Sequence, residues 1–230
     1  MHALVGFWFG LVEKFGLLGV VLLMAMESSI FPVPSEAVIP PAIYWAQKGQ
    51  VVLAGHALSS TQAFWMVVLA GTIGSWIGSA LTYWASCTLG RTFLERFGKW
   101  VHLTPEKIDR AERFIHRYEA GGIFFARLLP VVRHVISIPA GLVRMHFGTF
   151  SLMTIAGSFL WCLVLALFSQ HVFAKHADQD LIRNPEALVH VIKHESLPLL
   201  GFIALLLALY ALAMKLTAPK PGNQSATPSE

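Results

Sequence analysis

The chain has 230 residues, of which 55% are hydrophobic and only 13% are charged, a balance too apolar for a soluble domain of this length. Its formal net charge is +4, but the basic residues follow the boundaries of apolar stretches and leave no basic soluble region for a nucleic acid. We therefore expect an integral membrane protein with no nucleic-acid partner.

Four stretches are apolar and long enough to cross a bilayer as α-helices, which takes roughly 20 residues. In chain order they lie at about 5–26, 63–86, 149–170 and 197–216. No basic run precedes the first stretch and no small-residue cleavage site follows it, which favours a retained helix over a signal peptide. The expected fold is an all-α, multi-pass membrane protein with about four spanning helices.

Two further apolar segments, about 30–46 and 122–142, are interrupted by prolines, which remove backbone donors and break helices. The prolines assigned this role are Pro32, Pro34, Pro41, Pro130 and Pro139. Irregular backbone at membrane depth is tolerated only where it is buried in protein or lines a water-filled cavity. We therefore expect two central re-entrant hairpins, one entering from each face of the membrane.

Positive charge in short loops sets the orientation of a membrane protein. The densest run of lysine and arginine lies between residues 86 and 120, which places that segment in the cytoplasm. The loop at 171–196 balances its basic residues with acidic ones and is expected on the opposite face. Lys215 and Lys220 then return the C-terminus to the cytoplasm, so that both termini are expected there.

The two proline-containing segments resemble each other. A shift of 98 positions lays "FPVPSEAVIPPA" over "LPVVRHVISIPA". Two similar segments that enter from opposite faces form an inverted repeat, an arrangement used by many transporters. We expect one transmembrane domain over 1–217, in which two halves at about 5–86 and 122–217 flank a cytoplasmic amphipathic connector at about 87–121. Residues 218–230 are expected to form a disordered cytoplasmic tail.

Four charged residues fall inside the apolar segments: Glu27 and Glu36 in the first half, and Arg127 and Arg133 in the second. Each costs roughly 2.5 to 3.5 kcal/mol at the centre of a spanning helix, so we expect the hairpins to bring them together. Arginine presents a planar fork suited to phosphate, which makes the arginines candidates for substrate binding and the glutamates candidates for carrying a proton. The alternative is an ion-pair network that only locks the hairpins together.

Ser35 and His134 adjoin these charges in the sequence and are candidates for accessory roles. Close helix packing in lipid is expected at four glycines, namely Gly71, Gly74, Gly78 and Gly141.

The sequence offers little support for a metal site or a reaction. His190 and His194 have a helical spacing that can bind a metal, but no third ligand stands at a recognisable distance. We find no convincing set of nucleophile, base and orienting group. We therefore expect no cofactor, no metal and no catalytic residue.

Three motifs resemble the DedA family, the bacterial relatives of the VTT-domain, or SNARE-associated, membrane proteins. They are "ESSIFPVPSE", "YWASCTLGRTFLERFG" and "FFARLLPVVRHVISIPAG", and the resemblance covers about residues 15–170. It implies inverted re-entrant hairpins and a dependence on membrane-embedded acidic and arginine residues, matched here by Glu27, Glu36, Arg127 and Arg133. His134 departs from the pattern, because a small residue is expected after the second arginine.

The resemblance also implies a role in proton-motive-force homeostasis and cell-envelope integrity, with several members implicated in recycling undecaprenyl phosphate. We therefore expect an inner-membrane transporter of an anionic lipid, with undecaprenyl phosphate as the best single candidate and protons as the coupling ion. The alternatives are a proton-coupled transporter of a small ion or solute and a phospholipid scramblase. Assembly into a homo-oligomer is left open.

Overall fold

In the computed structural model, nearly all of the described chain is helical, as the long apolar stretches of the sequence predict. The residues that it describes are 2–29, 35, 38–49, 52–53, 56–97, 115, 121–129, 132–175 and 201. Over these residues the expected helical class is confirmed, apart from one small β-hairpin.

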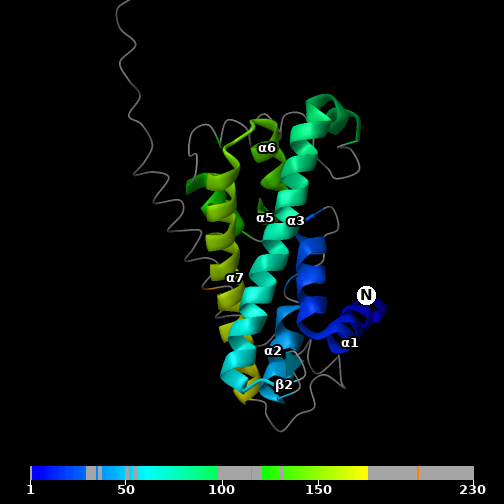
Figure 1. Ribbon diagram of the computed structural model, residues 1–230, viewed down its shortest axis with the longest axis vertical. Coiled ribbons are helices and arrows are strands. Elements are labelled where there is room, and N and C mark those ends of the chain that lie inside the picture. Colours follow the sequence, from blue (N-terminus) through cyan, green and yellow to red (C-terminus); the bar gives the residue numbers. More distant parts are fainter. Residues whose placement is uncertain are drawn as a thin grey trace, which may run out of the picture.

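Two long helices, α3 (Ser60–Phe97), which has a break at Gly90, and α7 (Phe147–Lys175), lie side by side along the longest axis of the molecule (Figure 1). Each contains a stretch that is long and apolar enough to cross a bilayer, at Ser60–Gly90 and Phe147–Lys175. The predicted spans at about 63–86 and 149–170 lie within these two stretches.

Helix α1 (His2–Glu27) covers the first predicted span, at about 5–26, but it is not one straight helix. Gly16 has φ 55° and ψ −132°, a backbone conformation that glycine adopts readily because it has no Cβ. The part after Gly16 packs along α3, whereas the N-terminal part turns away from the bundle (Figure 1). The prediction of a continuous first span is therefore corrected to two shorter helical parts.

Several predicted segments lie wholly or mostly outside the described residues. The fourth span, at about 197–216, is described only at residue 201, and the tail at 218–230 is not described. The connector at about 87–121 is described as far as Phe97 and again at Ile115 and Gly121.

Three short helices occupy the positions of the predicted hairpins. They are α2 (Ile39–Gln47), α5 (Val132–Val135) and α6 (Ser137–Leu142). Helix α2 lies towards one end of the long axis and α6 towards the other, and both pack against α3 (Figure 1).

The prolines of these segments stand at helix starts. Pro41 lies in the first turn of α2, and Pro139 lies in the first turn of α6. A proline is tolerated there because first-turn N–H groups have no partner within the helix. Both prolines thus lie in the first turn of a short helix. Pro32, Pro34 and Pro130 lie outside the described residues.

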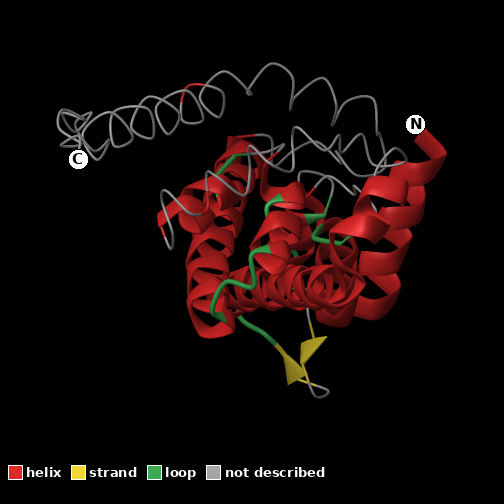
Figure 2. Ribbon diagram, turned by 90° about the horizontal axis from the view of Figure 1, so that it is seen from above, coloured by secondary structure: helices red, strands yellow, loops and turns green. Residues whose placement is uncertain are grey.

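The hairpin between α2 and α3 is the only β-structure in the described part of the chain. Strands β1 (Val52–Leu53) and β2 (His56–Ala57) pair antiparallel, with Val52 opposite Ala57 and Leu53 opposite His56. It projects from the helical layers (Figure 2).

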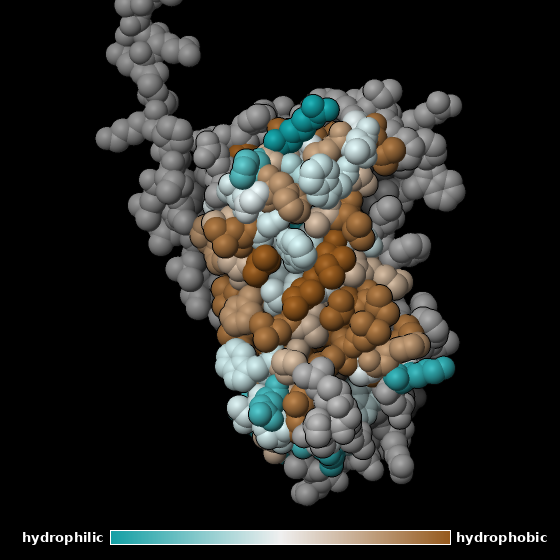
Figure 3. Space-filling view, viewed as in Figure 1, coloured by the Kyte–Doolittle hydropathy of each residue, from teal (hydrophilic) through white to brown (hydrophobic). Residues whose placement is uncertain are grey.

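Apolar side chains fill the interior in two clusters. The larger cluster joins α1, α2, α3 and α7, and the second joins α3, α6, α7 and the helical residues 121–127. Other large apolar side chains are exposed on α3 and α7, among them Leu69, Leu81, Leu152 and Leu167. Figure 3 shows that the middle of this face is mainly hydrophobic and that hydrophilic side chains gather towards its ends. Such a face suits contact with lipid tails.

The glycines predicted for packing lie at close helix contacts. A Cβ added at Gly74 or Gly78 would collide with the backbone of α1 at Val21 or Ala25. A Cβ added at Gly141 would collide with the backbone of Tyr83, whereas one at Gly71 would meet the side chains of Ile39 and Cys162, each at 3.0 Å.

Candidate functional site

A buried ion pair joins the two halves of the chain. Glu27 is the last residue of α1, Arg133 lies in α5, and their side chains are only 1% and 4% exposed. Arg133 Nη2 lies 3.2 Å from Glu27 Oε2, although the two residues are 106 positions apart. A buried charge that water cannot solvate is unfavourable without a partner, and in this pair each charge is compensated by the other.

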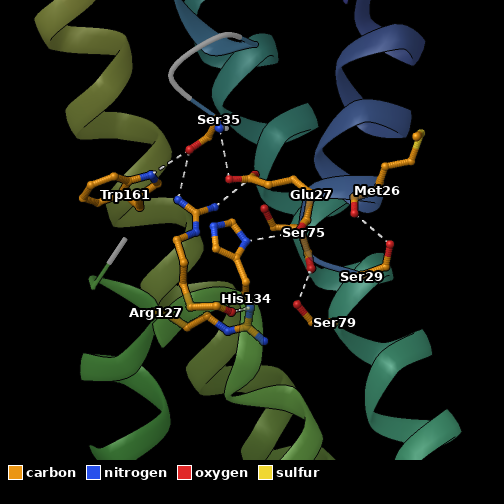
Figure 4. Close-up of polar contacts among 10 residues, drawn as sticks. Met26, Glu27, Ser29, Ser35, Ser75, Ser79, Arg127, His134 and Trp161 are labelled. Atoms are coloured by element: carbon orange, nitrogen blue, oxygen red, sulfur yellow. Dashed lines mark hydrogen bonds and ion pairs between the residues drawn. The ribbon is translucent and has the colours of Figure 1, made fainter. Parts of the chain in front are cut away.

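Ser35 completes this contact from the segment before α2 (Figure 4). Its backbone N–H donates to Glu27 Oε1 at 3.1 Å, and Arg133 Nη1 donates to its Oγ at 3.2 Å. The glutamate, the serine and the arginine are therefore linked to one another by hydrogen bonds. Ser35 is 1% exposed.

Trp161 brings the long helix α7 into the same set. Its Nε1 donates to Ser35 Oγ at 3.2 Å, and its ring centroid lies 5.4 Å from the guanidinium carbon of Arg133. That distance fits a cation–π contact, which strengthens when the cation is desolvated. Trp161 was missed by sequence reasoning because a tryptophan in a membrane helix is usually a packing or interfacial residue.

Arg127 lies beside this set but is held differently. Its Nη1 donates to the carbonyl oxygen of Arg133 at 2.9 Å, and its Nη2 donates to Ser137 Oγ at 2.7 Å. Its stem packs on Gly157, where an added Cβ would stand 2.6 Å from Arg127 Cβ, and its guanidinium lies 5.9 Å from the centroid of the Phe150 ring.

The charge of Arg127 has no ion-pair partner in the described structure. Its side chain is 2% exposed, yet no carboxylate among the described residues lies within ion-pair distance of it, and its Nε has no hydrogen-bond partner there. Carbonyl and hydroxyl oxygens solvate the guanidinium but do not neutralise it. A buried positive charge of this kind favours binding of an anion.

His134 contacts the end of α1 beside the ion pair, and the neighbouring helix α3 carries a row of buried hydroxyls. His134 Nδ1 lies 3.1 Å from the carbonyl oxygen of Glu27, so a proton on Nδ1 would cap the C-terminal end of α1. Helix α3 presents buried hydroxyl side chains at helical spacing, namely Thr72, Ser75, Ser79, Thr82 and Ser86. Ser75 and Ser79 face the region of Glu27 in Figure 4.

The structure thus brings together Glu27, Ser35, Arg133 and His134 and places Arg127 beside them. Glu36, the second predicted glutamate, lies outside the described residues. Ser137, like Trp161, was missed by sequence reasoning, because a serine near the start of a short helix usually has a local role.

These features define a helical membrane protein with a charged site buried among short helices. The chain belongs to the VTT-domain family, to which the DedA proteins are assigned: residues 48–171 match the family model described as the VTT domain. The resemblance drawn from the three motifs is therefore confirmed. Arg127, Arg133 and Trp161 lie inside the matched region, whereas Glu27 and Ser35 precede it.

Curated relatives agree with this assignment. The chain is 36% identical over 154 residues to the uncharacterized membrane protein YkoX of Bacillus subtilis, a match covering 67% of this chain and 63% of YkoX. It is 32% identical over 181 residues to undecaprenyl phosphate transporter A of the same organism, covering 79% and 84%. It is 31% identical over 159 residues to an alkaline phosphatase-like protein of Lactococcus lactis, covering 67% and 69%. No solved structure matches the chain.

The name of one of these relatives, undecaprenyl phosphate transporter A, and the family assignment support a membrane transporter.

Proposed function

We propose that this protein carries a polyprenyl phosphate, with undecaprenyl phosphate as the leading candidate, across the inner membrane of a bacterium under coupling to the proton motive force. The proposal rests chiefly on Arg127, a buried guanidinium that no carboxylate among the described residues neutralises. Two relatives named undecaprenyl phosphate transporter A support the substrate class.

The donors of Arg127 suit a phosphate group. A guanidinium has five N–H donors, of which the carbonyl of Arg133 and the hydroxyl of Ser137 use two. The remaining donors include Nε, and Arg133 adds a second guanidinium nearby. Arginine binds phosphate oxygens in pairs, which provides strength and orientation together. The isoprenoid tail would stay in lipid.

Proton coupling follows from the ion pair between Glu27 and Arg133. A phosphate that takes Arg133 as a partner releases Glu27, and a buried carboxylate without its arginine is stabilised by taking up a proton. When the phosphate leaves, Glu27 loses the proton and pairs with Arg133 again. One proton would therefore bind with each headgroup, and Glu27 would be the carrier. Glu36 remains a second candidate carrier.

We propose further that the short helices form two re-entrant hairpins of an inverted repeat, joined by the cytoplasmic connector into one domain. Helix α2 begins at Ile39 and α6 begins at Ser137, and the difference is the same 98 positions that relates the two sequence segments. Ser35 and Arg133 are equivalent under this shift, and they contact each other. Contact between equivalent residues is expected close to a pseudo-twofold axis.

Cysteine labelling tests the orientation of these hairpins. We expect Lys48→Cys, at the exposed C-terminal end of α2, to react with a membrane-impermeant maleimide from outside intact cells. We expect Arg144→Cys, exposed after α6, to react only after the cytoplasmic face is opened. Both changes are made in a Cys87→Ser, Cys162→Ala background, so that no native thiol competes. Labelling of both positions from the same side would exclude hairpins from opposite faces.

A reconstituted assay tests the substrate class. The purified protein in proteoliposomes should move a fluorescent polyprenyl phosphate between leaflets, faster with an imposed pH gradient than without it. The same vesicles should not move phosphatidylcholine or release trapped inorganic phosphate. Movement of phosphatidylcholine at the same rate would indicate a scramblase, and release of phosphate alone would indicate a small-solute transporter.

A further inference from the structure

The hydroxyl of Ser35 acts only as a hydrogen-bond acceptor in the described structure. Its oxygen accepts hydrogen bonds from Arg133 Nη1 and Trp161 Nε1, both at 3.2 Å. A serine hydroxyl has two acceptor lone pairs and one hydrogen, and neither nitrogen of these partners can accept that hydrogen. Both acceptor positions are therefore filled, and only the O–H is left to donate. Within the described structure this O–H has no acceptor, although Ser35 is 1% exposed.

We infer that Ser35 is a specificity-determining residue whose O–H donates to a phosphoryl oxygen of the headgroup, and that Trp161 positions it. This inference rests on the proposed function. An oxygen held by the guanidinium of Arg133 lies close to the Ser35 hydroxyl, because Arg133 Nη1 is in contact with Ser35 Oγ. The hydroxyl then adds a neutral donor to the two guanidinium groups. This donor strengthens the binding of a ligand that has several acceptor oxygens on one atom, as a phosphate monoester has.

Trp161 controls this donor in two ways. The indole Nε1 can only donate, so its hydrogen bond occupies a lone pair of Ser35 and limits the directions open to the hydroxyl hydrogen. The indole ring also makes a cation–π contact with the guanidinium of Arg133. One side chain of α7 thus contacts both a charged donor, Arg133, and a neutral donor, Ser35.

A purely structural role for the same contacts makes a different prediction. If the hydrogen bond from Trp161 to Ser35 only ties α7 to the first hairpin, its loss lowers the melting temperature and leaves the apparent affinity unchanged. If it positions a binding group, its loss raises the KM for the lipid. Trp161→Phe separates the two, since it removes the N–H and keeps an aromatic ring against Arg133.

The test is a double-mutant cycle in proteoliposomes, with KM measured as the mole fraction of polyprenyl phosphate at half-maximal rate. We expect Ser35→Ala to raise KM about tenfold and Trp161→Phe to raise it severalfold. We expect Trp161→Phe to add little once Ser35 is alanine, because the hydroxyl that it orients is gone. Trp84→Phe, at an exposed tryptophan of α3, serves as the matched control and should leave KM unchanged.

The outcomes separate this inference from the proposed function. An active wild type whose KM is unchanged in Ser35→Ala, or in which the two changes act additively, would overturn the inference alone. A wild type that moves no polyprenyl phosphate would overturn the proposed function and the inference with it.

Discussion

Arg127→Lys is expected to lower the rate of polyprenyl phosphate translocation about 100-fold while the protein remains folded. The arginine donates one hydrogen bond to the carbonyl of Arg133 and one to Ser137, which leaves other N–H groups for a ligand. A lysine ammonium carries the same charge but is a single point with three donors, and it cannot span both contacts while holding two phosphate oxygens. The measurement is the initial rate in proteoliposomes, corrected for the amount of folded protein.

Arg144→Lys is the matched control for this change. Arg144 is exposed in the turn between α6 and α7, so the same substitution there should leave the rate unchanged. If Arg127→Lys transported as fast as wild type, the arginine would serve only to lock the hairpins together.

Glu27→Gln is expected to remove the response of transport to a pH gradient and to destabilise the protein. Glutamine can still accept the backbone N–H of Ser35, but it cannot balance the charge of Arg133 or bind and release a proton. Removing one partner of a buried ion pair typically costs about 3 to 5 kcal/mol, so a lower melting temperature in detergent should accompany the change. The decisive readout is the ratio of the transport rates with and without the gradient.

The control is Lys14→Gln, at an exposed charged residue of α1, which should keep both the melting temperature and the gradient response. A Glu27→Gln variant that is folded and still accelerates under the gradient would rule out Glu27 as the carrier. The same measurement on Glu36→Gln would then decide whether Glu36 has that role.

Much of the site could be predicted from the sequence because burying a charge is expensive. A charged side chain in an apolar segment needs a partner of opposite charge. Arg133 and Glu27, 106 residues apart, form such an ion pair. The lengths of the apolar runs likewise predicted the helices that contain 63–86 and 149–170. The cost of burial does not indicate which arginine pairs with Glu27, and Arg127 is held by oxygens that carry no charge.

Other features depend on information that a local pattern does not contain. Gly16 is one glycine among several in apolar helices, and only its positive φ marks the break in α1. The contact from Trp161 to Ser35 joins residues 126 positions apart through a neutral hydrogen bond. Neither side chain is charged, so the sequence gives no energetic reason to expect that contact. Pro41 and Pro139 indicated interrupted helices, but their place in the first turn follows from the neighbouring backbone.

The central claim is that the buried arginines hold a charged lipid headgroup. Its most direct test is the rate at which proteoliposomes move polyprenyl phosphate, compared with the uncharged polyprenol of the same chain length. Wild type should move the phosphate and not the alcohol, and Arg127→Lys should remove the difference. Equal movement of both lipids by wild type would contradict it.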